Sequence, residues 1–208
     1  AIAQAPQSAV FPSAFASADA PSLCWLAGCC TDARQQTLVG SSHLAGLVGR
    51  SLTALEFRRS AGTVDFPAGA AQWTVTLSTS PRTAGACSPF FADNIGTDAV
   101  VVWSGPVAFP SSPAVATGPV PWTAPNVVRV AFQQPFVYRG GTLCVEITAS
   151  PVPGQVSGWW LADASWDPVE GSAISIGTSC GAHANAAGES SLASGKELVA
   201  GAFADLVA

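Results

Sequence analysis

The sequence has no methionine, a single tyrosine and few charged residues of either sign. Only 10% of its 208 residues are charged, whereas an average globular domain has about 25%. The formal net charge of −5 is spread thinly, and no stripe of basic residues is present that would follow a phosphate backbone. We therefore expect no nucleic-acid partner.

Long hydrophobic runs are also missing, although hydrophobic residues make up 49% of the chain. No run reaches the ~18 consecutive apolar residues that a membrane-spanning helix needs, so we expect no membrane span. The sequence starts at Ala1 without an initiator methionine, as exported proteins do after removal of a signal peptide. We therefore expect an extracellular or cell-surface protein, with simple trimming of the start as the alternative.

Six cysteines are present, and they are Cys24, Cys29, Cys30, Cys87, Cys144 and Cys180. An even number of cysteines in an exported chain indicates disulfide bonds, and six thiols allow fifteen connectivities. A metal site at the N-terminal group of three cysteines is the alternative. That group has no C-x-x-C spacing and no histidine at a matching offset. We predict disulfides without assigning their pairing, and no metal.

The dominant pattern is an alternation of apolar and polar residues with a period of two, which is typical of half-buried strands. In residues 72–79, Trp73, Val75 and Leu77 fall on one face. We expect these three side chains in the core of a sheet protein. Residues 142–149 alternate in the same way.

Two further segments refine the strand prediction. Residues 98–105 form a nearly continuous apolar run, which predicts a strand buried on both faces. Gly140 and Gly141 supply the positive φ angles that a tight turn between paired strands requires, so they predict a β-hairpin.

About eight such strands are separated by turns rich in proline and glycine, and no amphipathic helix is evident. This pattern favours an all-β fold, an antiparallel β-sandwich of jelly-roll or immunoglobulin-like type. We expect an extended N-terminal arm at 1–22, the sandwich at 23–180, and a small-residue linker followed by a C-terminal strand at 181–208. A strand is favoured over a helix in the last segment because Gly201 weakens a helix.

The segment GTSCG at 177–181 matches the G-x-S-x-G pattern of serine hydrolases. In those enzymes the serine lies on a sharp turn between a buried strand and a helix. The residues that follow here have no helical periodicity, His183 is too close to fold back, and His43 lies upstream, against the order of the triad. We therefore predict that the protein is not an enzyme and that the pattern is a disulfide-anchored turn.

Asp93, Asn94 and Asp98 place three oxygen-bearing side chains within six residues, which makes them candidate calcium ligands. The later glutamate of an EF-hand loop is missing, and Asp and Asn side chains commonly cap turns without a metal. We expect no cofactor, with calcium at this loop as the alternative.

Seven tryptophans form an unusual aromatic set. Flat indole rings stack on the apolar faces of sugars, and Trp166 and Trp160 are the candidates for such stacking. Trp166 lies between acidic residues in a predicted loop, and the adjacent Trp159 and Trp160 point to opposite faces of a strand. The alternative is that buried tryptophans fill a core whose other residues are small.

A series of short motifs runs through residues 30–165, namely ARQQTLVGSSHL, SLTALEFRRS, WTVTLSTSP, FFADNIGTDAVVVWSGPV, VAFQQPFVYRGGTLCVEI and GWWLADA. In this order they resemble a family of exported, uncharacterised β-sandwich proteins of environmental bacteria, whose motifs are R-Q-Q, F-R, L-S-T-x-P, F-A-x-N-x-G and P-F-x-Y. Thr37-Leu38 stands where that family usually shows an aromatic residue, so the first match is looser. The resemblance implies an exported β-rich fold and no catalytic residues.

Two functions fit these observations. Sparse charge and apolar segments at both ends favour a structural protein, such as a filament or surface-layer subunit, that assembles with copies of itself by strand addition from a terminal arm. The candidate assembly residues are Val10, Phe11, Phe15, Leu198 and Phe203. Packing of both ends on their own domain is the alternative for those segments. The second function is a carbohydrate-binding or adhesion module whose partners are extracellular glycans, and it predicts an exposed pair of aromatic side chains.

Overall fold

The computed structural model describes residues 8–11, 13–20, 22–26, 28, 32–88, 90–153, 160–164, 171–176 and 204–207. For residues 22–25, 164, 171–176 and 204–207 it describes the backbone only. Several residues singled out in the sequence therefore lie outside the described residues: Cys29, Cys30, Trp166, Cys180, His183, Leu198, Phe203 and the motif at 177–181.

The described part of the chain forms eleven β-strands and four short 3-10 helices, with no α-helix. The strands are β1 (Ser8–Val10), β2 (Ser22–Trp25), β3 (Ala33–Val39), β4 (Ser51–Arg58), β5 (Gly69–Thr79), β6 (Val100–Phe109), β7 (Val127–Val137), β8 (Leu143–Pro151), β9 (Leu161–Ala164), β10 (Gly171–Ile176) and β11 (Ala204–Val207). The 3-10 helices are η1 (Ser13–Phe15), η2 (Ala45–Leu47), η3 (Ala84–Ala86) and η4 (Phe91–Asp93).

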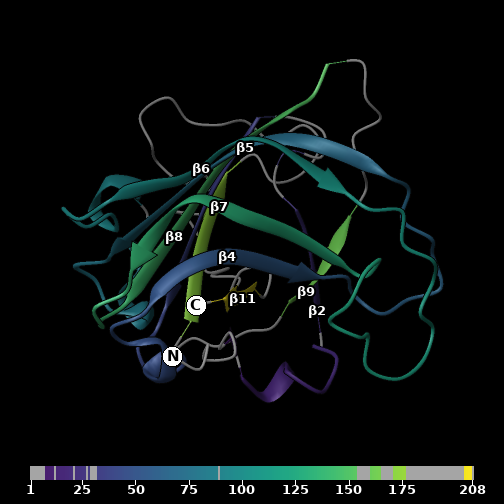
Figure 1. The fold of residues 1–208 in the computed structure, drawn as a ribbon, viewed down its shortest axis with the longest axis horizontal. Helices are drawn as coiled ribbons and strands as arrows, with labels where there is room; N and C mark the ends of the chain where they lie inside the picture. The colour runs from purple at the N-terminus through teal and green to yellow at the C-terminus, as the bar shows by residue number, and fades with distance from the viewer. Residues whose placement is uncertain are drawn as a thin grey trace, which may run out of the picture.

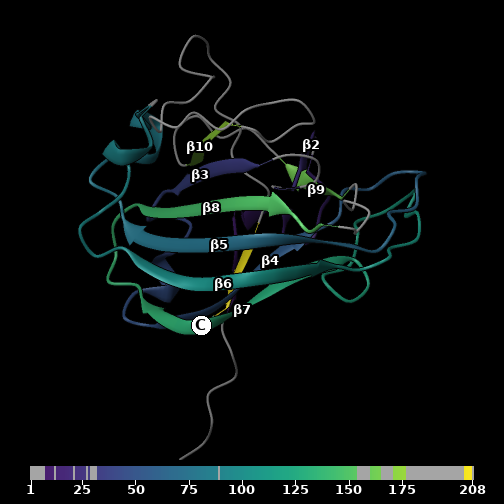
Figure 2. The same ribbon diagram turned by 90° about the horizontal axis from the view of Figure 1, so that it is seen from above.

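These strands form two large sheets and one small sheet, and every described pairing is antiparallel. One sheet has the order β1-β11-β4-β7 and the other the order β10-β3-β8-β5-β6 (Figures 1 and 2). The third sheet pairs β2 with β9. The predicted all-β antiparallel sandwich is therefore confirmed. No helix in the described part of the chain is long and apolar enough to cross a membrane.

The core lies between the two large sheets and is built from one face of each strand. Trp73, Val75 and Leu77 are fully buried, as their shared face predicts. The ring of Phe57 on β4 meets Trp73 on β5 edge to face, with the ring centroids 5.7 Å apart. Such contacts between strands of opposite sheets hold the two layers together.

The apolar run at 98–105 does not form a strand buried on both faces, so that prediction is wrong. β6 is the edge strand of the five-stranded sheet, and Val101 is 45% exposed. The register of β6 against β5 shifts between Val75 and Thr76, and this bulge changes which side chains face the core. Hydrophobicity alone did not reveal that the run lies at an edge.

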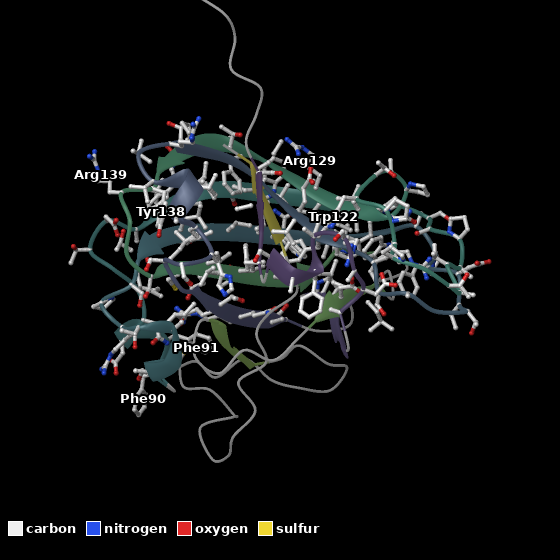
Figure 3. The ribbon with its side chains drawn as sticks, turned by 90° about the horizontal axis from the view of Figure 1, so that it is seen from below. Phe90, Phe91, Trp122, Arg129, Tyr138 and Arg139 are labelled. Carbon is white, nitrogen blue, oxygen red and sulfur yellow. The ribbon has the colours of Figure 1, made fainter. Side chains whose placement is uncertain are left out.

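The turn at Gly140 and Gly141 is confirmed, but the predicted hairpin is wrong. The two glycines have φ angles of 103° and 88°. The turn joins β7 to β8, and these strands belong to different sheets. The Tyr138 hydroxyl donates a hydrogen bond to the Gly141 carbonyl (2.6 Å), which fixes the crossing from one sheet to the other (Figure 3).

Edge strands β6 and β7 lie next to each other on one side of the sandwich (Figure 2). Glutamine side chains of β7 join them. Gln133 on β7 donates to the Ser104 carbonyl (3.0 Å) and accepts from the Ser104 amide (3.1 Å). Gln134 donates to the Val101 carbonyl. These amides occupy main-chain groups that an edge strand otherwise offers to another chain.

Candidate functional site

The candidate site is the position of the C-terminal strand within the four-stranded sheet. β11 is hydrogen-bonded on both sides, to β1 and to β4, and it runs antiparallel to each. Leu206 lies opposite Ala9 on one side and opposite Leu55 on the other. Among the described strands, β1 therefore joins the sheet only through β11. The prediction that the last apolar segment contains a strand is confirmed for Ala204–Val207.

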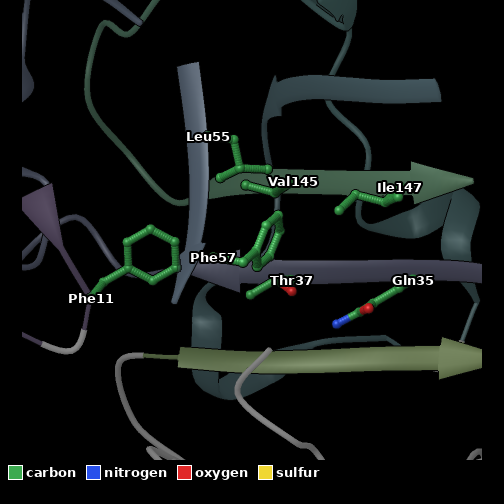
Figure 4. Close-up of a pocket in the computed structure, with 7 residues that line it drawn as sticks. All are labelled: Phe11, Gln35, Thr37, Leu55, Phe57, Val145 and Ile147. Carbon is green, nitrogen blue, oxygen red and sulfur yellow. The ribbon is translucent and has the colours of Figure 1, made fainter. Parts of the chain in front are cut away.

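Beneath this strand the side chains pack closely. Phe11, which follows β1, and Leu55 and Phe57 of β4 are 5%, 0% and 4% exposed. They border a cavity of about 10 Å³ between the sheets (Figure 4). That volume holds about one water molecule, whereas ligand pockets measure about 300 Å³ or more. The core under β11 is therefore a packing surface and not a ligand pocket.

The N-terminal arm contributes to the core of its own chain. Phe11 is buried among core residues, and Val10 and Phe15 are half-buried. Of these three candidates for contact with another copy, Phe11 packs in the core of its own chain. Leu198 and Phe203 lie outside the described residues.

The candidate calcium ligands are engaged separately with protein groups. Asp98 accepts hydrogen bonds from the Thr79 amide (2.8 Å) and hydroxyl (2.7 Å). Asn94 is fully buried and donates to Gln36 (3.0 Å). Asp93 pairs with Arg82 (3.3 Å). Each side chain fastens the loop to a different neighbour, and among the described residues no group of three or more His, Cys, Asp or Glu side chains is placed to hold a metal ion.

Trp160 is a core residue, so the prediction that it stacks on a ligand is wrong. Its side chain is fully buried, and its indole N–H donates to the Pro110 carbonyl (2.9 Å). Its ring packs against Phe66 with the centroids 5.6 Å apart. The alternative, that tryptophans fill the core, describes Trp73 and Trp160. Trp166 lies outside the described residues.

Sequence reasoning missed a buried ion pair between Arg58 at the end of β4 and Asp163 on β9. Arg58 Nε and Nη2 donate to Asp163 Oδ2 at 2.9 and 2.5 Å, and the two side chains are 1% and 2% exposed. The guanidinium also lies over the ring of Trp122, 4.9 Å from its centroid; Trp122 is labelled in Figure 3. Burial raises the pKa of Asp163, and the hydrogen bonds from Arg58 act in the opposite direction.

A second polar network lies on the outer face of the five-stranded sheet. Arg34 on β3 donates to Glu146 on β8 through Nε and Nη2, at 2.9 and 2.8 Å. Gln36 donates to the same carboxylate oxygen (2.7 Å) and to the Phe91 carbonyl (3.0 Å). The alternation in residues 142–149 places Glu146 on one face of β8, but it does not show which strand or loop lies against that face.

Next to this network the outer face carries an open groove of about 350 Å³. It crosses β3, β8 and β5, and its polar lining comes from Asp32, Arg34, Gln72, Thr74, Thr148 and Ser150. Hydroxyl, amide, carboxylate and guanidinium groups therefore occur together on one surface. No aromatic side chain is among the described residues that line it.

The disulfide prediction stays open. Cys144 is buried and carries a free thiol in the structure, while Cys87 is half-buried. The side chain of Cys24 and all of Cys29, Cys30 and Cys180 lie outside the described residues.

Taken together, the fold and this site define an all-β sandwich whose four-stranded sheet is completed by its C-terminal strand. No protein-family model matches the chain, and no curated protein and no solved structure gives a significant match to it.

Proposed function

We propose that this chain is a structural subunit, exported to the cell surface or the medium, which assembles with copies of itself by exchanging its C-terminal strand. The observation that carries the proposal is the position of β11, hydrogen-bonded between β1 and β4. A strand that completes a sheet makes the same main-chain hydrogen bonds whether it comes from its own chain or from a neighbour.

The connection before β11 supports exchange between chains. Residues 177–203 separate β10 from β11, which is a stretch of 27 residues. Fully extended, it spans about 90 Å, whereas the longest strands of the sandwich have 11 residues and measure about 36 Å. Its length therefore allows β11 to enter the sheet of an adjacent copy.

The other side of the sandwich disfavours strand addition. Gln133 and Gln134 occupy main-chain groups of Ser104 and Val101 on β6. A strand that approached β6 would have to displace these amides before it formed new hydrogen bonds. These contacts therefore disfavour assembly through the β6 edge.

The experiment uses a chain that ends at residue 195 and a synthetic peptide of residues 196–208. The truncated chain lacks β11 and exposes the hydrogen-bonding edge of β4, so we expect it to bind the peptide and to gain thermal stability. The control peptide carries Leu206→Pro, because proline removes an amide that β11 uses in the sheet. Equal binding of the two peptides, or binding of neither to a folded chain, would contradict insertion of this strand.

Glycan binding is a second candidate function, and the polar groove on the outer face favours it. Sugar hydroxyls are bound by carboxylate, amide and guanidinium groups of the kind found there. We expect Gln72→Ala to weaken any such binding, because Gln72 is exposed and lines the groove without joining the Arg34–Glu146 network. A glycan screen in which no sugar binds the unmodified protein would remove this candidate.

A further inference from the structure

Two of the six cysteines meet on the outer face of the five-stranded sheet. Cys144 of β8 is 1% exposed and lies opposite Leu38 on β3 and Ser78 on β5. It forms a small buried cluster with Leu38 and Ala84 of η3. Cys87, directly after η3, packs against the same cluster. Residues 57 positions apart in sequence are thus brought to one place by the loop that crosses the sheet.

The loop that carries Cys87 is fastened by hydrogen bonds of the residues that follow it. Ser88 donates its amide to Asn94 Oδ1, and Asn94 donates to the Ser88 carbonyl, both at 2.9 Å. Farther along the loop, the Gly96 amide donates to the Ser78 hydroxyl (3.0 Å), which is on the strand next to Cys144. These contacts fix the backbone around Cys87 over β8.

Two of the other cysteines, Cys24 and Cys180, lie in or next to described strands in the sequence. Cys24 lies in β2, in the small sheet, where it is opposite Ala162. Cys180 follows β10 in sequence, and the end of β10 nearest to it, Ile176, lies beside Arg34. The opposite end of β10, near Gly171, is the one beside Leu38 and Val39. The described strands therefore place neither Cys24 nor the end of β10 that precedes Cys180 beside Cys144.

We propose that Cys87 and Cys144 form a disulfide bond that fastens the loop between β5 and β6 to β8. A small-molecule disulfide is the oxidant. The Cys87 thiolate attacks one of its sulfurs, which forms a mixed disulfide and releases one thiolate. The Cys144 sulfur then loses its proton, attacks Cys87 Sγ and expels the second thiolate. Two cysteine thiols are oxidised, and the small disulfide is reduced to two thiols.

Burial assigns the order of these steps. Cys144 is almost fully buried, and the pKa of its thiol is raised, chiefly by desolvation and further by Glu146 and Cys87. Cys87 is only half-buried, so it is the cysteine that meets an oxidant from solution. The pairing also lowers the number of possible connectivities for the remaining cysteines, because four thiols allow only three.

The test is peptide mapping of the native protein, oxidised with glutathione disulfide and alkylated at acid pH without reduction. Digestion with trypsin and an endoprotease specific for glutamate separates the three relevant cysteines, because Cys87 falls in residues 83–129, Cys144 in 140–146 and Cys180 in 171–189. We expect a linked pair of the peptides 83–129 and 140–146. Recovery of 140–146 joined to another peptide would overturn the pairing. So would recovery of 140–146 as a single peptide with Cys144 alkylated, because its thiol was then free.

Single and double substitutions separate a disulfide from simple packing. Cys87→Ala should leave Cys144 as a thiol and lower the melting temperature of the oxidised protein. Adding Cys144→Ala should lower the melting temperature further only by the effect of removing one sulfur from the core. Reduction should lower the melting temperature of the unmodified protein toward that of Cys87→Ala. Equal melting temperatures of oxidised and reduced protein would contradict a bond at this position.

Discussion

At the scale of single residues, the fold depends on charged and polar side chains that are buried with their partners. Arg58 is 1% exposed, and besides its bonds to Asp163 it donates to the Val120 and Ala18 carbonyls at 3.2 and 2.6 Å. It therefore links β4 and β9 to the loop after β6 and to the N-terminal arm. A charge in this position is tolerated only because its donors are occupied.

Replacing Asp163 with asparagine tests this arrangement. The substitution keeps the shape of the side chain but removes the buried carboxylate that pairs with Arg58, which leaves the more distant, partly exposed Asp19 at 4.0 Å. We expect a loss of about 3–5 kcal/mol in the free energy of unfolding, measured by urea titration. Arg129→Ala is the matched control, because it removes an exposed arginine, 48% accessible, from its pair with Glu56. That change should cost less than about 1 kcal/mol, and equal losses in the two variants would contradict the argument.

The Cys144 thiol gives the reduced protein a dependence on pH. Burial raises the pKa of this thiol above its ordinary value of 9.0. The unfolded chain therefore releases this proton at a lower pH than the folded chain. The free energy of unfolding that the protonated thiol contributes is fully present below pH 9, and it is lost progressively as the pH rises above that value. In the presence of a reductant, we expect the free energy of unfolding to fall more steeply between pH 8 and pH 10 in the unmodified protein than in Cys144→Ala. Parallel pH profiles would show that Cys144 does not titrate in this way.

Single residues were also the hardest feature to predict. The face shared by Trp73, Val75 and Leu77 follows directly from a period of two, and it is correct. Trp160 has the same aromatic chemistry as a ligand-binding residue, and its full burial and the hydrogen bond of its indole N–H to Pro110 identify it as part of the core. Asp98 likewise resembles a metal ligand until its bonds to Thr79 are known.

At the scale of elements, the loop between β5 and β6 is as closely packed as the strands. The Gly96 backbone lies so near β5 that an added Cβ would be 1.8 Å from the Thr79 carbonyl oxygen and 2.8 Å from Asp98 Oδ1. No side chain fits there unless the backbone moves. This position explains why the loop carries a glycine two residues after its buried Asn94.

We expect Gly96→Ala to lower the free energy of unfolding by about 1–3 kcal/mol, because the strand or the loop must shift to admit the methyl group. Thermal unfolding followed by circular dichroism measures the loss. Gly46→Ala is the control, since a Cβ at that position meets nothing within 4 Å, and it should change stability by less than about 0.5 kcal/mol. Equal melting temperatures of the two variants would contradict the close packing of this loop.

Strands were predicted well from alternation, but their neighbours were not. Residues 98–105 have the composition of a central strand, but β6 lies at an edge, where Gln133 and Gln134 of β7 contact it. The Gly140-Gly141 turn has the backbone that a hairpin needs, yet β7 and β8 separate into different sheets. Pairing depends on contacts between distant residues, which a local pattern does not contain.

At the scale of the whole molecule, the two ends of the described chain meet in one sheet. β1 and β11 are paired with each other, and β11 is paired with β4. The sequence indicated apolar, strand-like segments at both ends, but it left open where they pack. A sheet completed by a strand at the end of a 27-residue connection is the feature on which the proposed self-assembly rests.

The measurement that tests this proposal most directly is the mass of the native protein in solution, determined by light scattering over a range of concentrations. The full chain should form oligomers or polymers. The chain that ends at residue 195 should not assemble by itself, because assembly needs residues 196–208 on a second copy. Electron microscopy of the same samples gives the shape of the assemblies. A full chain that stays a monomer of 20.9 kDa at every concentration, also after unfolding and refolding at high concentration, would contradict assembly by strand exchange.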